Sequence, residues 1–411
     1  MNNSTQTTFL TSVAEVFSRQ YRRVSRFFGR QSDQQAEPIK VNTDLCLAQS
    51  ARRANLYASM ALPETLLQAF SVEPLAAGDA RFVGREEQLN HVLAALEMWR
   101  DGRTSMVAVT GPQGCGISSF LQQLAQLVGD NEIYHYGKLT RLPYDINDSL
   151  ALLSAVIGRE QSVGSLEELV EYINGLPPSL FAIDNGHFLA CRIMGRSEAI
   201  RVFGAVIVAT QQRHLWVLGC QEYAWRRLAY VYRADRYFTE RIELPMFSEA
   251  ELGQCLTARL QASGITLISE MTREDPQMPA GFARQLNTLY KLGNGKPDFS
   301  FFYFLGSLNV HDENKRWDIR PATELHFSIL KQLISEELFT LTEVAAHGQL
   351  TIDEHRALFR TSHEESWLLL ERLYHLCLLD KNGTASEPAY HLVPLYSDVI
   401  SRHLTNANYL Y

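Results

Sequence analysis

The stretch GPQGCGISSF occupies residues 111–120 and directly follows the apolar run SMVAVT. An apolar strand, a glycine-rich turn and the start of a helix form the context of a phosphate-binding loop, whose backbone N–H groups cradle phosphates. Gly111 and Gly116 have the G-x-x-x-x-G spacing of such a loop, and Ser118 stands where a hydroxyl holds Mg²⁺. Between them lies Ile117, where these loops carry a lysine. The sequence therefore predicts the architecture of the loop without its cation.

A second apolar strand, SLFAID, supplies the other half of such a site. It ends in Asp184, whose carboxylate can reach Mg²⁺ through the water shell of the ion, while the hydroxyl of Ser118 holds it. We expect ATP or ADP with Mg²⁺ as the ligand, if nucleotide binds. The residues predicted to contact it are Gly111, Gly114, Gly116, Ile117, Ser118 and Ser119.

Two further apolar runs, HLWVLGC at 214–220 and RIELP at 241–245, predict strands, and segments of helical length lie between the four. Strands and helices that alternate in this way predict an α/β fold with a right-handed parallel sheet. Helical segments follow to about residue 310. A C-terminal unit of helices and a terminal hairpin then has the element order of a winged helix.

Four motifs, FVGREEQL, GPQGCGIS, IDNGH and WVLGC, occur in the order of AAA+ and STAND-type P-loop ATPases, which the chain resembles over about residues 80–310. The C-terminal unit resembles the winged helix of the origin-recognition and transposition-helper branches. The resemblance implies a helical lid that contains GFARQLNTL, in which a sensor arginine, here Arg284, points at the γ-phosphate. It also places Asp184 and Asn185 beside the reacting phosphate.

The pattern and the resemblance together predict five parts. These are an amphipathic helix and linker at 1–40, a helical connector at 41–79, the P-loop α/β core at 80–245, the helical lid at 246–319 and the winged-helix-like domain at 320–411.

Three positions that act on the γ-phosphate in the family are replaced here. Ile117 supplies no charge, and the next lysine along the chain is Lys138. Asn185 stands where a glutamate polarises the attacking water, and an amide cannot take a proton. Gly219 stands where a threonine or asparagine senses the phosphate. Because loss of one such donor costs orders of magnitude in rate, we expect no hydrolysis.

Nucleotide binding is a separate question with two answers. The loop backbone and Ser118 favour weak binding of ADP or ATP, whereas packing of Ile117 into the pocket would leave only a scaffold. The favoured hypothesis is a regulatory or scaffolding pseudo-ATPase that acts through protein partners, with homo-oligomers left open. The alternative is a divergent but active ATPase coupled to DNA or to a membrane-associated complex.

The charge of the chain argues against DNA as the partner of the winged-helix-like domain. The formal net charge is −8, and acidic residues outnumber basic ones in 322–405. The segment expected to act as recognition helix begins with His363, Glu364 and Glu365 and also carries Glu371. Carboxylates that face phosphates repel them, so a surface for protein contacts is the better interpretation.

Residues 1–31 form a predicted amphipathic helix with an aromatic-rich face and an arginine-rich face. Residues 8–30 suit the surface of an anionic membrane, a groove on a partner, or packing on this chain's own core. The scattered cysteines and the lack of a long apolar stretch predict a cytoplasmic protein, peripheral to the inner face of a membrane if the helix binds lipid.

Two weaker candidates remain. Arg233 and Arg236 precede the fourth strand, where such ATPases place an arginine finger, although surface arginines at such a turn are more often solvated. Cys115 lies inside the loop at a helix start, where a thiol can be reactive, although a buried and inert cysteine is the commoner case.

Overall fold

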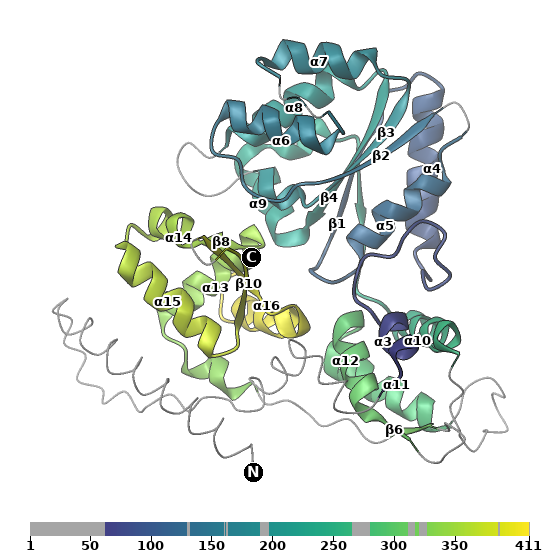
Figure 1. The fold of residues 1–411 in the computed structure, drawn as a ribbon, viewed down its shortest axis with the longest axis vertical. Helices are drawn as coiled ribbons and strands as arrows, with labels where there is room; N and C mark the ends of the chain where they lie inside the picture. The colour runs from purple at the N-terminus through teal and green to yellow at the C-terminus, as the bar shows by residue number, and fades with distance from the viewer. Residues whose placement is uncertain are drawn as a thin grey trace. The chain divides into compact units, whose positions relative to one another are not determined.

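The computed structural model describes residues 62–410 except 130–131, 160, 162, 190–196, 265–279, 311–316, 320–326 and 385–386 (Figure 1). The predicted N-terminal helix lies outside the described residues. The chain divides into a larger unit, which holds the described residues up to 319 with 346–348, and a smaller C-terminal unit. No described helix is long and apolar enough to cross a membrane.

A five-stranded parallel sheet with the order β2-β3-β4-β1-β5 organises the larger unit. All residues of β1 and β3, and nearly all of β4, are buried, as is usual for parallel strands covered on both faces. Because β1, β4 and β3 are adjacent and parallel, their carboxyl ends meet at one edge. The strands are β1 Met106–Gly111, β2 Ile133–Lys138, β3 Ser179–Asp184, β4 His214–Gln221 and β5 Glu240–Glu243.

Helices cover both faces of the sheet (Figure 1). Side chains alternate between the faces along each strand, so Trp216 and Leu218 pack with one helix group and Leu215 and Val217 with the other. One face carries α6 Ile146–Val156, α7 Leu166–Gly175, α8 Glu198–Thr210 and α9 Glu222–Tyr232, and the other carries α4 Glu86–Arg100 and α5 Ile117–Gln123. The predicted α/β P-loop architecture is confirmed.

The helices that the sequence analysis assigned to a lid follow β5 in the same unit, and α3 Glu64–Ala69 packs against them from the preceding segment. Phe70 stacks on Phe304 with 5.4 Å between ring centroids. The buried guanidinium of Arg259 donates to the carbonyl oxygens of Ala69 (2.6 Å) and Ser71 (3.0 Å). The remaining lid elements are α10 Glu249–Ser263, α11 Ala280–Gly293, α12 Pro297–Ser307, β6 Leu308–Val310 and β7 Trp317–Ile319.

The C-terminal unit has helices and a terminal hairpin, as predicted, and a short strand, β8, which was not predicted, lies between its first two α-helices. Its sheet has the order β8-β10-β9 and is antiparallel. Its elements are η5 Ser328–Gln332, α13 Ser335–His347, β8 Leu350–Thr351, α14 Ile352–Phe359, α15 His363–His375, β9 Leu379–Gly383, β10 Pro388–Leu392, η6 Pro394–Tyr396 and α16 Ser397–Asn406.

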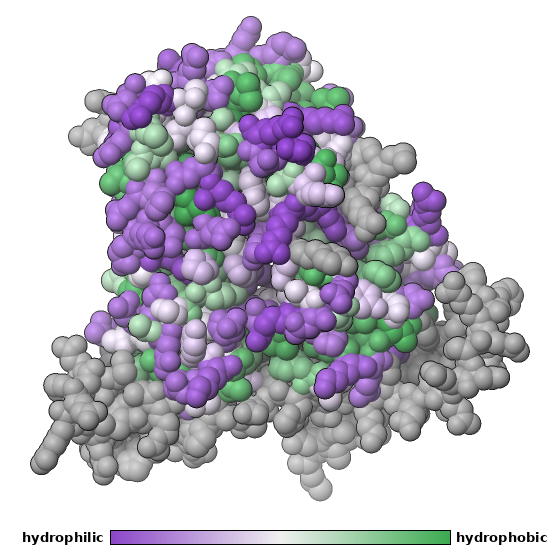
Figure 2. Space-filling model, turned by 180° about the vertical axis from the view of Figure 1, so that it is seen from behind, coloured by the Kyte–Doolittle hydropathy of each residue, from purple (hydrophilic) through white to green (hydrophobic). Residues whose placement is uncertain are grey.

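On the face shown in Figure 2, hydrophilic side chains predominate and hydrophobic ones lie between them in small groups.

The prediction that Glu371 faces outward from the recognition helix is wrong. Its carboxylate is buried and accepts hydrogen bonds from the hydroxyl of Tyr390 (2.6 Å) and from the Lys381 ammonium (2.9 Å). Glu365 caps its own helix through Ser362. Glu364 therefore stays as an exposed acid of this helix, and the acidic character of the surface is weaker than the sequence indicated.

Candidate functional site

The glycine-rich loop has the backbone of a phosphate cradle. Gly114 and Gly116 have φ angles of 88° and 98°, a region that suits glycine and few other residues. A Cβ at Gly111 would lie 2.5 Å from both the Cys115 Sγ and the carbonyl oxygen of Leu244, so only glycine fits there. The loop thus closes tightly on the residue that follows β5.

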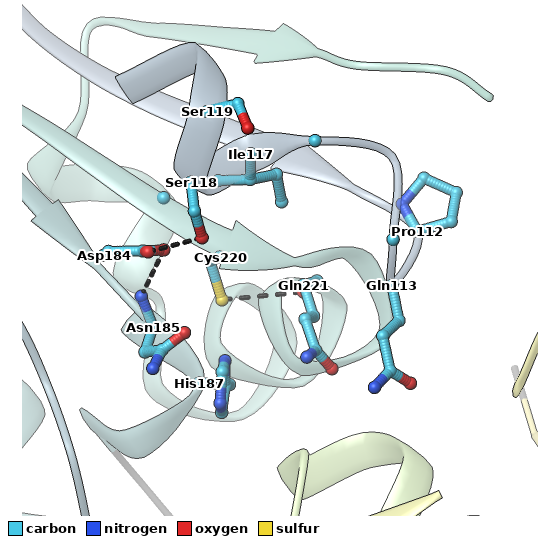
Figure 3. A pocket seen from close by; sticks show the side chains of 13 residues that line it. Pro112, Gln113, Ile117, Ser118, Ser119, Asp184, Asn185, His187, Cys220 and Gln221 are labelled. Carbon is cyan, nitrogen blue, oxygen red and sulfur yellow. Dashed lines mark hydrogen bonds between the residues drawn. The ribbon is translucent and has the colours of Figure 1, made fainter. Parts of the chain in front are cut away.

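A cavity of about 230 Å³ lies between this loop and the carboxyl ends of β3 and β4 (Figure 3). Five of the six predicted nucleotide-contacting residues line it, and Gly111 lies outside the lining. The lining residues are Pro112, Gln113, Gly114, Gly116, Ile117, Ser118, Ser119, Asp184, Asn185, His187, Gly219, Cys220 and Gln221. The structure therefore brings the loop and the carboxyl end of β3 together, as the motif order predicted.

The carboxylate of Asp184 is buried and accepts three hydrogen bonds. Its Oδ2 accepts from the Ser118 hydroxyl (2.6 Å) and from the Tyr136 hydroxyl (2.8 Å). Its Oδ1 accepts from the backbone N–H of Asn185 (2.8 Å; Figure 3). Burial and the neighbouring Asp184 charge raise the pKa of Tyr136, so this phenol stays protonated and donates. The protein's own donors thus engage both carboxylate oxygens.

Tyr136 was not foreseen from the sequence. It lies on β2, directly beside β3, and pairs in register with Ala182. Only the strand order brings its hydroxyl to Asp184, and a tyrosine in a half-exposed strand carries no signal of that order. The residue is the main addition of the structure to the site.

Asn185 holds the turn at the end of β3. Its φ of 60° lies in the left-handed region, which asparagine tolerates better than most residues. Its side-chain Nδ2 donates to the carbonyl oxygen of Leu139 (2.9 Å). The side chain therefore ties two strand ends together, and it offers no group that takes a proton from water.

The replacements at Ile117 and Gly219 are coupled by packing. A Cβ at Gly219 would lie 2.7 Å from the Cγ2 of Ile117 and 2.7 Å from the Cδ1 of Leu121. Cβ atoms essentially never approach other atoms so closely. A threonine or asparagine at 219 would therefore collide with the isoleucine that replaces the loop lysine. The isoleucine at 117 therefore accounts for both the missing lysine and the missing sensor side chain at 219.

Two ionisable groups near the loop are held neutral by burial. Cys115 is completely enclosed, and burial raises the pKa of its thiol to about 12, so it is not a reactive thiolate. Burial lowers the pKa of His187 to about 3. Among the described residues, no group of three or more His, Cys, Asp or Glu side chains could hold a metal ion. Any Mg²⁺ would depend on Asp184 and Ser118.

The predicted arginines stand apart from this cavity. Arg233 and Arg236 are exposed, and the guanidinium of Arg233 lies 3.8 Å from the carboxylate of Asp235. Arg284 falls in α11, but its side chain lies outside the described residues. Neither exposed arginine lines the cavity, so a finger role within this chain's own site finds no contact to support it.

Arg85 was also missed, although it lies in the FVGREEQL motif. Its side chain is buried, and its Nη2 donates to the carbonyl oxygens of Cys115 (3.1 Å) and Pro245 (2.7 Å). The guanidinium carbon lies 4.4 Å from the ring centroid of Phe247. The Arg85 side chain thereby holds the glycine-rich loop against the segment that contains Pro245 and Phe247. A second cavity, of about 90 Å³, lies behind the loop and is lined by Arg85 among others.

Residues 81–183 match the model of the AAA ATPase domain. The chain carries an AAA+ P-loop domain. No curated protein sequence matches it.

Several solved structures align with most of this chain at low sequence identity. The Aeropyrum pernix ORC2 protein in its ADPNP–ADP complexes shares 13% identity, with 82% of this chain and 96% of that chain covered and a TM-score of 0.46. Drosophila ORC bound to DNA shares 14%, with 94% and 99% covered and a TM-score of 0.41. The Thermotoga maritima RuvB branch-migration motor shares 14%, with 80% and 98% covered and a TM-score of 0.37.

Proposed function

We propose that this AAA+ protein is a regulatory pseudo-ATPase, which binds ADP or ATP weakly, does not hydrolyse ATP at a physiological rate, and acts through protein partners. The observation that carries the proposal is the state of Asp184. In an active site of this type the carboxylate serves Mg²⁺, whereas here Ser118, Tyr136 and the Asn185 N–H engage it. These three donors support the proposal that the carboxylate serves an internal hydrogen-bond network.

The catalytic losses support the same conclusion. Ile117 stands where a lysine would act, and its side chain leaves no room for a sensor side chain at Gly219. The Asn185 side chain donates to the carbonyl oxygen of Leu139 and cannot serve as a base. Removal of a single transition-state donor costs about 100- to 1,000-fold in kcat. Three such losses together reduce turnover below any useful rate.

The loop itself supports nucleotide binding. The left-handed glycines keep the backbone in the form whose N–H groups receive phosphates, and the cavity beside the loop is open to a ligand. The oxygens of Asp184 and Ser118 are of the kind that Mg²⁺ prefers. Because the Tyr136 and Ser118 hydroxyls already bond the carboxylate, magnesium would have to replace them. We therefore expect nucleotide binding that depends little on Mg²⁺.

The proposed contacts with protein partners lie outside the P-loop core. We propose that the C-terminal unit contacts protein partners, with DNA as the second choice, since Glu364 remains an exposed acid on α15. Residues 8–30 are proposed as a further contact, to a partner or to a cytoplasmic membrane surface, on their sequence pattern alone.

Calorimetric titration of the purified full chain with ADP, with and without Mg²⁺, tests the binding half of the proposal. We expect a measurable affinity that changes less than about threefold when Mg²⁺ is removed, a difference of well under 1 kcal/mol. The matched control is Gly114→Val, which places a side chain on the left-handed loop glycine and should abolish binding. Absence of ADP binding by the wild-type chain would reduce the protein to a scaffold and contradict the proposal.

A further inference from the structure

Among the described residues that line the cavity beside the glycine-rich loop, Asp184 is the one with a charged side chain. Glutamine, serine, asparagine, cysteine and apolar residues make up most of the remaining lining. Burial lowers the pKa of His187 to about 3, so its imidazole is neutral as well. A nucleotide that places its phosphates in this cavity therefore meets a negative charge that no lining side chain balances.

The hydrogen bonds that Asp184 accepts do not cancel its charge. The Ser118 hydroxyl, the Tyr136 hydroxyl and the Asn185 N–H are all neutral donors (Figure 3). In the part of the chain that the structure describes, Asp184 forms no ion pair. A hydroxyl has a single proton, and Ser118 gives its proton to the carboxylate. In this arrangement the carboxylate keeps its negative charge, and Ser118 has no proton left for a phosphate.

The Oδ1 of Asp184 borders the residue that replaces the loop lysine. It lies 3.4 Å from the point that a Cβ of Gly219 would occupy, and the Cγ2 of Ile117 lies 2.7 Å from the same point. The Asn185 N–H donates to this oxygen (2.8 Å), and a carboxylate oxygen has a second lone pair. A loop lysine would balance the charges of carboxylate and phosphate here, whereas Ile117 offers only hydrocarbon.

We propose that Asp184 makes the site selective for a diphosphate, so that the chain binds ADP more tightly than ATP. The inference rests on the proposed nucleotide binding. The loop N–H groups suit the phosphates of either ligand, but ATP brings one more phosphate into a cavity whose lining is already negative. Like charges at close range repel each other, and more strongly away from bulk water. The hydroxyls that bond the carboxylate also hinder the bridging Mg²⁺ that would relieve this repulsion.

The test compares ADP with ATP by calorimetric titration of the full-length chain without Mg²⁺. We expect ADP to bind at least about tenfold more tightly, the effect that a close like charge has on an ionisable group when it shifts the pKa by one unit. Asp184→Asn removes the charge at nearly constant size, and the preference should fall to about threefold or less. The matched control Glu222→Gln makes the same change at a carboxylate outside the lining, which is paired with Arg226, and should leave the preference unchanged.

A second variant serves if Asp184→Asn does not fold. The three donors face both carboxylate oxygens, so an asparagine turns its NH₂ group toward at least one of them. Ile117→Lys instead leaves these bonds in place and adds a positive charge beside the carboxylate. It should raise the affinity for ATP more than the affinity for ADP.

A further comparison needs no variant. Pyrophosphate and tripolyphosphate differ by one phosphate and carry no base, so they isolate the phosphate part of the site. Pyrophosphate should displace fluorescent mant-ADP from the wild-type chain at a lower concentration than tripolyphosphate does. The reverse order would contradict the inference.

The outcomes separate the inference from the proposed function. Wild-type binding of ATP that equals or exceeds that of ADP would overturn the inference and leave the proposed function intact, and it is the result expected if Arg284 of α11 reached the last phosphate. An unchanged preference in folded Asp184→Asn or Ile117→Lys protein would overturn the role of Asp184. Failure of the wild-type chain to bind ADP would overturn both.

Discussion

Replacement of Tyr136 by phenylalanine removes one of the two hydroxyls that bond the Oδ2 of Asp184, at 2.8 Å. A hydrogen bond to a charged group contributes about 1.5–3 kcal/mol, so the free energy of unfolding should fall by about that amount. The freed lone pair of the carboxylate then becomes available to a cation. We therefore expect Tyr136→Phe to make ADP binding respond to Mg²⁺, in contrast to the wild-type chain.

The matched control is Tyr134→Phe on the same strand. The hydroxyl of Tyr134 donates to the carbonyl oxygen of Leu121 at 2.5 Å, a neutral acceptor, so its loss should cost about 0.5–1.5 kcal/mol. It should leave the response to Mg²⁺ unchanged. Urea denaturation measures the first quantity, and calorimetric titration of ADP over a range of Mg²⁺ measures the second. Equal destabilisation by the two variants, with no gain of Mg²⁺ dependence in Tyr136→Phe, would refute the reasoning about Asp184.

Two further predictions concern packing and pH. Gly219→Thr should lower the free energy of unfolding by about 1–3 kcal/mol, because the threonine collides with Ile117. The same substitution should cost less stability in an Ile117→Ala background. Urea denaturation that shows an equal loss of stability in both backgrounds would contradict the coupling. Burial lowers the pKa of His355 from the ordinary histidine value of 6.5 to about 4. As the pH falls below 6.5, His355 is therefore protonated in the unfolded chain while it stays neutral in the folded chain. Stability should therefore decline by up to about 1.4 kcal/mol per unit between roughly pH 6.5 and 4, with a shallower slope in His355→Gln, and equal slopes would disprove this origin.

The motif order was sufficient to predict the α/β core and the meeting of Ser118 with Asp184. Buried strands and a glycine-rich turn are local patterns, and parallel strands bring their carboxyl ends to one edge. Glu371 was misjudged, because the face that a helix buries depends on partners such as Tyr390, which the helix sequence does not show.

The joint loss at Ile117 and Gly219 could be read from the sequence only as two separate absences. Their common cause is the 2.7 Å approach between the Ile117 Cγ2 and the Cβ point of Gly219, which requires β4 to lie beside the start of α5. The engagement of Asp184 likewise depends on Tyr136 from β2, the edge strand next to β3. Both features arise from strand order, which local sequence does not encode.

The most direct test of the central claim is phosphate release from ATP by the purified full-length chain, measured with and without Mg²⁺ beside Asp184→Ala. The account predicts release below about one turnover per minute, far under the usual enzyme range of about 1–1,000 per second, and no difference between the wild-type chain and Asp184→Ala. Faster release that requires Mg²⁺ and disappears in Asp184→Ala would show that Asp184 still serves catalysis, and would contradict the account.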